Sequence, residues 1–326
     1  MYTGTGRVIA SNGGLFTVRL FVGEPSFSMP LDGKTVTGRG RGSLHRKGAL
    51  LVGDLVGVSY DDTAFTNTTE GVHVSEDGTG LVIDRIFERK NALIRPPMAN
   101  LDVLFVTVAA AAPLPILETV DKLIAIAEYN HIDPVIVITK SELNSAYADS
   151  LAQIYRTAGF TVFQTGDGLE DRNNELKTFV DNALHGKIAA FSGASGVGKS
   201  TLLNRLFPKL QLETGELSHR IERGKNTTRA TCLYSLSDDM NCGYLADTPG
   251  FTMLDFERFD FFEKEDLPST FREFLPYIGD CRYTKCSHTK EEGCAVLEAV
   301  KRGDIPRSRH QSFLSVYEIL KKKTKW

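Results

Sequence analysis

The strongest chemical signal in this chain is a glycine-rich segment that matches the phosphate-binding pattern G-x-x-x-x-G-K-S/T. The segment comprises Gly193, Ala194, Ser195, Gly196, Val197, Gly198, Lys199 and Ser200, followed by Thr201. Its glycines let backbone N–H groups converge on phosphate oxygens, and a helix that begins here adds the positive end of its dipole. Lys199 would then reach the β- and γ-phosphates of a nucleotide, and the Ser200 hydroxyl would bind Mg²⁺.

The residues on either side of this segment argue against a chance match. Lys187–Phe191 is a short apolar run that is typical of a buried strand, and Thr201–Phe207 has the pattern of a helix. A strand, a glycine-rich turn and a helix, in this order, are the context that the motif requires. We therefore interpret the segment as a P-loop.

Two later segments contain groups that would complete a nucleotide site. Asp247 follows the apolar run Cys242–Ala246, so its carboxylate can hold Mg²⁺ while the N–H of Gly250 faces the γ-phosphate. The alternative is an ordinary turn, because Asp, Pro and Gly all favour turns. In the segment between the P-loop and Asp247, Thr227 or Thr228 would bind Mg²⁺. Analogy with other Thr-Arg switch loops favours Thr228.

The guanine-reading segment stands in an unusual place. The candidate for this role comprises Thr139, Lys140, Ser141 and Glu142, which precede the P-loop. In an ordinary GTPase the corresponding segment follows the other motifs. The order therefore predicts a GTPase domain that has been cut and rejoined, with its phosphate-binding half moved toward the C-terminus.

A second ligand-bearing cluster lies near the C-terminus. Its spacing is Cys-x₄-Cys-x-His-x₅-Cys, formed by Cys281, Cys286, His288 and Cys294. Three thiolates and one imidazole would make a closed tetrahedral Zn²⁺ site with a structural role. A disulfide is disfavoured in a cytosolic protein, and the spacing with the histidine disfavours unconnected buried thiols.

The elements that must position these groups alternate between strands and helices. Asp102–Ala109 and Pro134–Ile138 are apolar runs typical of strands, and Phe160–Phe163 is a third. Between the first two, apolar residues from Ile116 to Ala127 recur at helical spacing. This alternation predicts a parallel α/β sheet, in which ligands bind at the carboxyl ends of the strands.

The first 90 residues follow a different pattern. Short alternating segments such as Leu15–Phe21 and Gly80–Ile86 are separated by Gly, Asp and Asn, which favours a five-stranded barrel of the OB type. A basic loop without acidic residues spans positions 33–53 and contains Lys34, Arg39, Arg41, His45, Arg46 and Lys47. It is either a solvated loop or a contact for an RNA phosphate backbone.

Length and composition fit a protein of several domains. The chain has 326 residues and a net charge of −3, so any nucleic-acid contact must come from local patches. No apolar stretch resembles a signal peptide or a membrane span, and we expect a soluble, cytoplasmic monomer. The predicted fold is multidomain: an OB-type barrel in 1–90, a permuted P-loop α/β GTPase domain in 91–262, and a mainly helical zinc module in 263–326.

These motifs together resemble the bacterial ribosome small-subunit-dependent GTPase A family, over essentially the whole chain. The likeness includes Gly53-Asp54, the junction Asn91–Asn100, the P-loop, Asp247–Phe251 and the zinc cluster. The resemblance implies GTP and GDP as ligands, with Mg²⁺ and one structural Zn²⁺. It also implies a partner, the small ribosomal subunit with its rRNA, and hydrolysis of GTP during late maturation of that subunit.

The chain departs from the pattern of the family at the guanine and catalytic positions. Thr139 and Glu142 stand where the family usually has Asn and Asp, so preference for guanine is expected to be looser. Asn226 stands where the family usually has a histidine to which a catalytic role has been assigned, and an amide cannot take a proton from water near neutral pH. Phe251 cannot orient water, although this is usual in the family.

With Asn226, Thr228 and Lys199 as the catalytic candidates, these departures predict slow hydrolysis by the free protein. Docking on the subunit would order the loop and bring Arg223 or Arg229 to the transferring phosphoryl group. Two alternatives remain from the sequence alone. One is a P-loop ATPase or small-molecule kinase, and the other is a GTP-gated RNA-binding protein with negligible hydrolysis.

Overall fold

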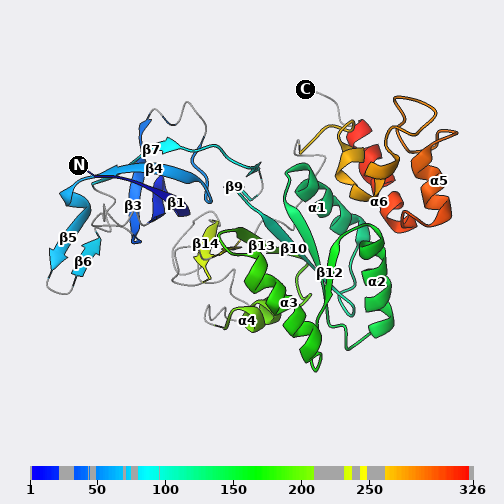
Figure 1. Cartoon of the computed structure of the whole chain (residues 1–326), viewed down its shortest axis with the longest axis horizontal. Helices are drawn as coiled ribbons and strands as arrows, with labels where there is room; N and C mark the ends of the chain where they lie inside the picture. Colours follow the sequence, from blue (N-terminus) through cyan, green and yellow to red (C-terminus); the bar gives the residue numbers. More distant parts are fainter. Residues whose placement is uncertain are drawn as a thin grey trace. The chain divides into compact units, whose positions relative to one another are not determined.

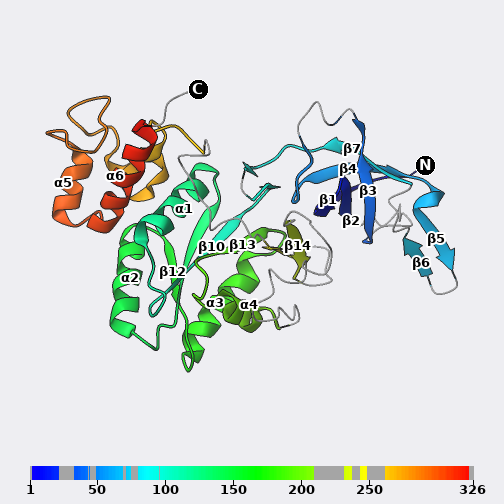
Figure 2. The ribbon, with the colours of Figure 1, turned by 180° about the vertical axis from the view of Figure 1, so that it is seen from behind.

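The computed structural model shows two compact units, each assembled from three stretches of the chain. One unit contains 1–101, 184–190 and 215–249, and the other contains 102–183, 191–214 and 250–326. The structure describes residues 2–21, 33–42, 44, 49–68, 71–74, 80–94, 96–208, 231–236, 243–247 and 261–322. Figures 1 and 2 show the ribbon of the chain from opposite sides.

The first unit begins with a closed five-stranded barrel. Its strands are β1 (Tyr2–Asn12), β2 (Leu15–Leu20), β3 (Thr35–Gly40), β4 (Leu55–Tyr60) and β7 (Leu81–Ile86). They follow the order β1-β2-β3-β7-β4, and β4 pairs back with β1. Only the β3–β7 pair is parallel, and the other four are antiparallel. This closed arrangement confirms the predicted OB-type barrel.

Alternation within the strands explains why the barrel has an apolar interior. Val8, Val18, Val36 and Ile83 are fully buried, whereas their neighbours along each strand point outward. A short 3-10 turn (Asp62–Ala64) and the hairpin of β5 (Phe65–Thr68) and β6 (Gly71–Val74) are inserted between β4 and β7. The hairpin extends away from the barrel in both ribbon views (Figures 1 and 2).

The sequence predicted that the basic segment of the barrel is one continuous loop, but the structure shows that strand β3 lies within it. Lys34 immediately precedes strand β3, and Arg39 lies on it, both with exposed side chains. The strand had escaped prediction because its inward positions are Val36 and the small Gly38, which give little apolar signal. Arg41 is exposed just after the strand, whereas His45, Arg46 and Lys47 lie outside the described residues.

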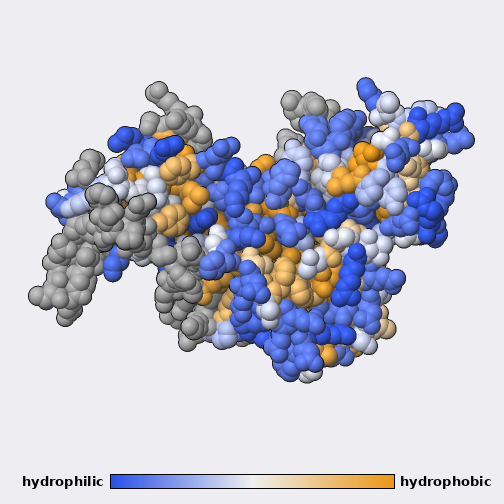
Figure 3. All heavy atoms as spheres, in the orientation of Figure 1, coloured by the Kyte–Doolittle hydropathy of each residue, from blue (hydrophilic) through white to orange (hydrophobic). Residues whose placement is uncertain are grey.

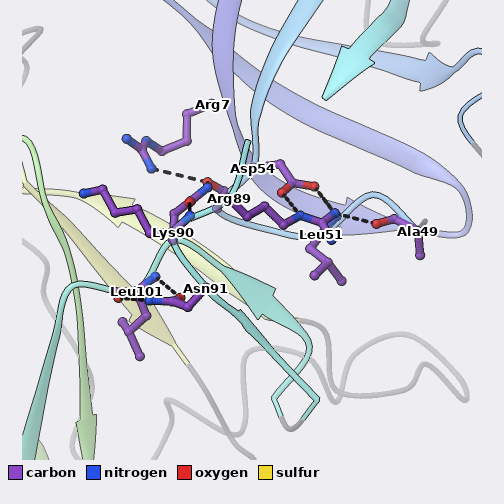
Figure 4. A network of polar contacts seen from close by, with 10 residues as sticks. Arg7, Ala49, Leu51, Asp54, Arg89, Lys90, Asn91 and Leu101 are labelled. Carbon is purple, nitrogen blue, oxygen red and sulfur yellow. Dashed lines mark hydrogen bonds and ion pairs between the residues drawn. The ribbon is translucent and has the colours of Figure 1, made fainter. Parts of the chain in front are cut away.

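A network of polar contacts closes the end of the barrel where the chain leaves it (Figure 4). The Arg89 guanidinium binds both carboxylate oxygens of the fully buried Asp54, at 2.6 and 2.8 Å, and donates to the Ala49 carbonyl. The Asn91 side chain donates to the Leu101 carbonyl and accepts from the Leu101 N–H, as a strand partner would. Charge-assisted and paired bonds of this kind fix the exit path of the chain.

Three further strands belong to the first unit beyond the barrel. β13 (Ile188–Ser192) begins here, β15 (Tyr244–Asp247) pairs with it in parallel, and β14 (Cys232–Ser235) pairs antiparallel with β15. β14 also pairs with barrel strand β1, at Ala10 and Cys232. Two short strands, β8 (Ala92–Leu93) and β9 (Met98–Ala99), form a small hairpin at the junction.

The second unit contains a parallel three-stranded layer in the order β12-β11-β10. β10 (Val103–Ala109) is buried throughout, β11 (Asp133–Thr139) is buried after its first residue, and β12 (Thr161–Gln164) is shorter. Its helices are α1 (Leu117–Tyr129), α2 (Ser145–Thr157), α3 (Glu170–Ala183) and α4 (Lys199–Leu206). The alternation confirms the predicted α/β class.

Helix α1 differs from expectation at two positions. Ile116 precedes the helix and is 73% exposed, whereas the charged Asp121 is buried. The inward carboxylate is explained by Arg309, which pairs with it at 2.7 Å from the C-terminal helix α6. A search for apolar residues at helical spacing misses a buried charged residue such as Asp121, because the residue is buried through its ion pair.

The C-terminal residues pack on α1 within the second unit. Two 3-10 turns (Leu267–Thr270 and Arg272–Tyr277), α5 (Ala295–Arg302) and α6 (Arg307–Lys322) surround a core that contains Phe271, Phe274 and Phe313. Residues over α5 are mainly hydrophilic on the face drawn in Figure 3, and its Val296 and Ala299 are buried. Among the described helices, none has the length and apolar character needed to cross a bilayer.

Candidate nucleotide site and metal centre

The P-loop connects β13 to α4 through a turn that requires glycine. At Gly193, with φ of +152°, a Cβ atom would lie 2.3 Å from the Thr107 carbonyl oxygen. The loop therefore passes directly against β10, and its main chain is available to a ligand. Lys199 starts α4, and its Nζ donates to the carbonyls of Gly193 (2.6 Å) and Ala194 (2.9 Å). Burial lowers the pKa of this lysine.

The guanine-reading candidate lies against the P-loop, although 58 residues separate the partners in sequence. The Thr139 hydroxyl is within hydrogen-bond distance of the Val197 and Val108 carbonyls, and its single proton can serve one of them at a time. Lys140 Nζ donates to the Gly196 carbonyl at 2.8 Å and to the Ala112 carbonyl at 2.5 Å. Thr139 is the last residue of β11 and Lys140 follows it, so the carboxyl end of that strand meets the phosphate loop.

Glu142 extends toward the loop that follows β12. Its carboxylate approaches Gly166 so closely that a Cβ atom there would lie 1.8 Å from Oε2. The Ser141 N–H donates to the Thr165 carbonyl at 3.1 Å, which ties the two loops together. Asn144 then caps α2 by accepting from the Tyr147 N–H.

Two residues that hold this second loop were not identified from the sequence. The Asn173 amide donates to the Gly166 carbonyl and accepts from its N–H, at 2.8 and 3.2 Å. Arg205, on α4, donates to the same carbonyl and pairs with Asp167 at 2.7 Å. The contacts of Arg205 join residues 39 and 38 positions apart, whereas Asn173 lies only 7 positions from Gly166. A polar residue at a buried position of a helix was the one signal that could have identified Asn173.

Several predicted site residues cannot be placed. Asp247 is the last residue of β15, where its main chain pairs opposite Cys232. Arg223, Asn226, Thr227, Thr228, Arg229, Gly250 and Phe251 lie outside the described residues. The described structure therefore brings together the P-loop and the guanine-reading segment, and it leaves the roles of the switch residues as predictions.

The four predicted zinc ligands converge in the C-terminal module. One ligand atom from each of Cys281, Cys286, His288 and Cys294 lies within 4.8 Å of all the others. His288 Nδ1 is 3.6 Å from Cys281 Sγ and 3.5 Å from Cys294 Sγ, and the two sulfurs are 3.9 Å apart. Tetrahedral Zn²⁺ with bonds of about 2.3 Å to sulfur and 2.0 Å to nitrogen has edges of about 3.5–3.8 Å, so the set fits zinc.

The surroundings of the cluster fix the shape of the ligand loop. Glu291 accepts from the N–H groups of Ser287 and Thr289, at 2.9 and 3.0 Å. Burial would raise the pKa of this carboxyl, but hydrogen bonds from the Ser287 hydroxyl and N–H and from the Lys290 N–H lower the pKa to about 2. The Ala295 N–H points at Cys281 Sγ. Burial raises the pKa of the Cys286 thiol to about 12, a cost that a bound Zn²⁺ would remove by taking the thiolate directly.

We expect Cys286→Ala to lose bound zinc and to unfold the C-terminal module, because the metal links loops that bury little apolar surface. Elemental analysis of the purified chain should give about one zinc per chain, and the variant much less. Cys232→Ala is the matched control, since this cysteine lies on β14 and outside the cluster. Folded native protein without zinc would contradict the assignment.

Comparison with known proteins relates this arrangement to one family. The family model described as RsgA GTPase matches residues 86–257, more than half of the chain. The chain belongs to the RsgA GTPase family. A relative from Alkaliphilus metalliredigens, named small ribosomal subunit biogenesis GTPase RsgA, is 38% identical over 88% of this chain and 91% of its own. A relative of the same name from Agathobacter rectalis is 33% identical over 99% and 100%.

Solved structures extend the RsgA comparison to the whole fold. YjeQ from Thermotoga maritima has a TM-score of 0.72 at 27% identity, covering 99% of this chain and 100% of its own. YloQ, described as a circularly permuted GTPase, has a TM-score of 0.71 at 26% identity, covering 100% and 97%. The permuted order predicted from the motifs is thereby confirmed.

Proposed function

We propose that this chain hydrolyses GTP to GDP and phosphate and acts in the biogenesis of the small ribosomal subunit, whose rRNA it binds. The observation that carries the proposal is the contact of Thr139 and Lys140 with the P-loop, which supplies a guanine-reading edge beside a phosphate cradle. Membership of the RsgA GTPase family supports the reaction, and the names of the relatives supply the subunit as partner.

The residue roles follow from motif chemistry. Lys199 and the P-loop N–H groups hold the β- and γ-phosphates, and Glu142 accepts from guanine N1–H and the 2-amino group. Ser200, Thr228 and Asp247 are the residues that would hold Mg²⁺, which neutralises charge that develops on the phosphate oxygens. Gly250 senses the γ-phosphate. Asn226 hydrogen-bonds the attacking water but cannot accept its proton near neutral pH.

The other parts of the chain would provide the contact with RNA. The barrel (1–90) presents Lys34, Arg39 and Arg41 on its exposed surface, and Arg46 and Lys47 follow in sequence. These cations suit a phosphate backbone. We propose that the GTPase part (91–262) and the zinc module (263–326) act with the barrel in a cytoplasmic monomer.

The test of this function is turnover of GTP with and without purified small subunits, with large subunits as the control. We expect slow hydrolysis by the free chain and an acceleration of about tenfold or more on small subunits, weakening as salt rises. Binding energy from the subunit would order the groups around the γ-phosphate, since phosphoryl transfer depends mainly on positioning. A free chain that already turns over at the stimulated rate would contradict the proposal.

The same experiment separates the alternatives. A GTP-gated RNA-binding protein would bind small subunits in the presence of GTP and show negligible turnover under every condition. An ATPase or kinase would prefer ATP and would not respond to small subunits.

A further inference from the structure

The barrel and the strand that ends at Asp247 are connected through one continuous row of paired residues. Ala10 of β1 pairs opposite Cys232 of β14, and Cys232 pairs opposite Asp247 of β15. β14 begins at Cys232, three positions after Arg229 in the sequence. The barrel is therefore joined, through the backbone of the single strand β14, to the strand that ends at Asp247.

Two arginines of the barrel reinforce this connection. Arg7 on β1 and Arg19 on β2 are directly paired neighbours, and Tyr244 and Ser235 are directly paired on β15 and β14. The Arg7 guanidinium lies over the Tyr244 ring, 5.3 Å from its centroid, and Arg19 Nη1 donates to the Ser235 hydroxyl. Each arginine of one strand pair thus meets one residue of the other pair. We call these four residues the barrel–switch square.

Charge makes this arrangement informative. Like charges directly opposite on neighbouring strands are destabilising, so two adjacent arginines need external partners. Arg7 finds an aromatic face and the Gly53 carbonyl at 3.3 Å (Figure 4), and Arg19 finds the Ser235 hydroxyl. The contacts of the two arginines with β14 and β15 offset part of the repulsion between Arg7 and Arg19. The stability of β1 and β2 therefore depends on where β14 and β15 lie.

We propose that Arg7 and Arg19 are positioning residues that transmit binding at the barrel to β14 and to β15, the strand that ends at Asp247. This inference rests on the proposed stimulation of GTP hydrolysis by the small subunit. RNA bound to the exposed cations on and next to β3 would hold β3 and the strands paired with it in one conformation. The barrel–switch square then passes that conformation to β14 and β15. The arginines do not touch the nucleotide, and they act through the strands that they hold.

The test compares Arg7→Ala and Arg19→Ala in the full chain. We expect unchanged affinity for GTP, unchanged basal turnover and unchanged cosedimentation with small subunits, but a stimulation reduced at least about fivefold. Arg19→Lys keeps a donor for Ser235 and should restore most of the stimulation. The double variant Arg19→Ala with Ser235→Ala should be no worse than Arg19→Ala alone, because both remove the same contact.

Arg85→Ala is the matched control. This barrel arginine also lies over an aromatic ring, 4.7 Å from the Phe87 centroid, and its removal changes the charge equally without touching the square. Stimulation equal to that of the native chain in both test variants would overturn the inference. A loss of stimulation that is explained by weaker binding to the subunit would also overturn the inference. An equal loss of stimulation in Arg85→Ala would do the same.

A second measurement keeps the inference separate from the proposed function. Hydrogen exchange at the N–H groups of 232–235 should be faster in Arg19→Ala than in the native chain and unchanged in Arg85→Ala. If Arg19→Ala fails to fold, Ser235→Ala, which removes only the acceptor, takes its place. Faster exchange without any subunit stimulation of the native chain would refute the proposed function and the regulatory role, whereas unchanged exchange would refute the coupling itself.

Discussion

Replacement of Arg309 by methionine is expected to lower the free energy of unfolding of the second unit by about 3–5 kcal/mol, because it strands two carboxylates in the interior. Arg309 is 1% exposed and binds Asp121 at 2.7 Å and Glu273 at 2.7 and 3.2 Å. Burial alone would lower its pKa, but these carboxylates raise it above the ordinary value. Phe160 and Phe271 flank the guanidinium.

Urea denaturation followed by circular dichroism measures this effect, and release of zinc to a chromophoric chelator reports on the module itself. Arg302→Met is the control, since Arg302 pairs with Asp304 at the surface and such pairs contribute about 0–1 kcal/mol. Arg309→Lys should also destabilise, because one ammonium cannot reproduce a guanidinium fork shared by two carboxylates. Equal stability of Arg309→Met and Arg302→Met would contradict the buried network.

Glu142→Ala is expected to remove most of the preference for GTP over ATP. Two charge-assisted hydrogen bonds to guanine, at about 1.5–3 kcal/mol each, correspond to about 10²- to 10⁴-fold in relative affinity. Adenine presents an acceptor at N1 where guanine has a donor, so the carboxylate also repels the wrong base. Competition against a fluorescent guanine nucleotide measures both affinities.

Three further variants sharpen this experiment. Glu142→Asp keeps a carboxylate and should keep the preference, whereas Lys199→Ala should weaken both nucleotides alike. Gly166→Ala should act like Glu142→Ala, since its Cβ would collide with the Glu142 carboxylate. Equal affinity of the native chain for ATP and GTP would point to the ATPase or kinase class instead.

The sequence predicted those parts of the fold whose signals are local. The strand, glycine turn and helix around Lys199 lie within one short stretch, and the zinc ligands lie within residues 281–294. The alternating barrel segments also predicted a five-stranded barrel, although they gave neither strand β3 nor the order β1-β2-β3-β7-β4. In each case the residue types carry the information without help from distant positions.

Contacts between residues far apart in the chain could not be predicted from the sequence. Asp121 and Arg309 are 188 residues apart, and each reads in isolation as a surface charge on a helix. The pairing of Arg19 with Ser235 spans 216 residues and depends on β1 and β14 meeting in one sheet. Tertiary packing determines such partners, and it produces no periodic pattern in the sequence.

The division of each unit among three stretches has a consequence for biosynthesis. A ribosome can release the barrel strands early, yet the first unit lacks β14 and β15 until residues as far as 249 have emerged. The second unit likewise lacks its last stretch until residues 250–326 have emerged. The closed barrel can form early, but neither unit can be completed until most of the chain has been translated. The long sequence separations between paired strands favour slow folding, and a fragment that lacks residues 215–249 would leave β13 without its partner β15 and exposed to aggregation.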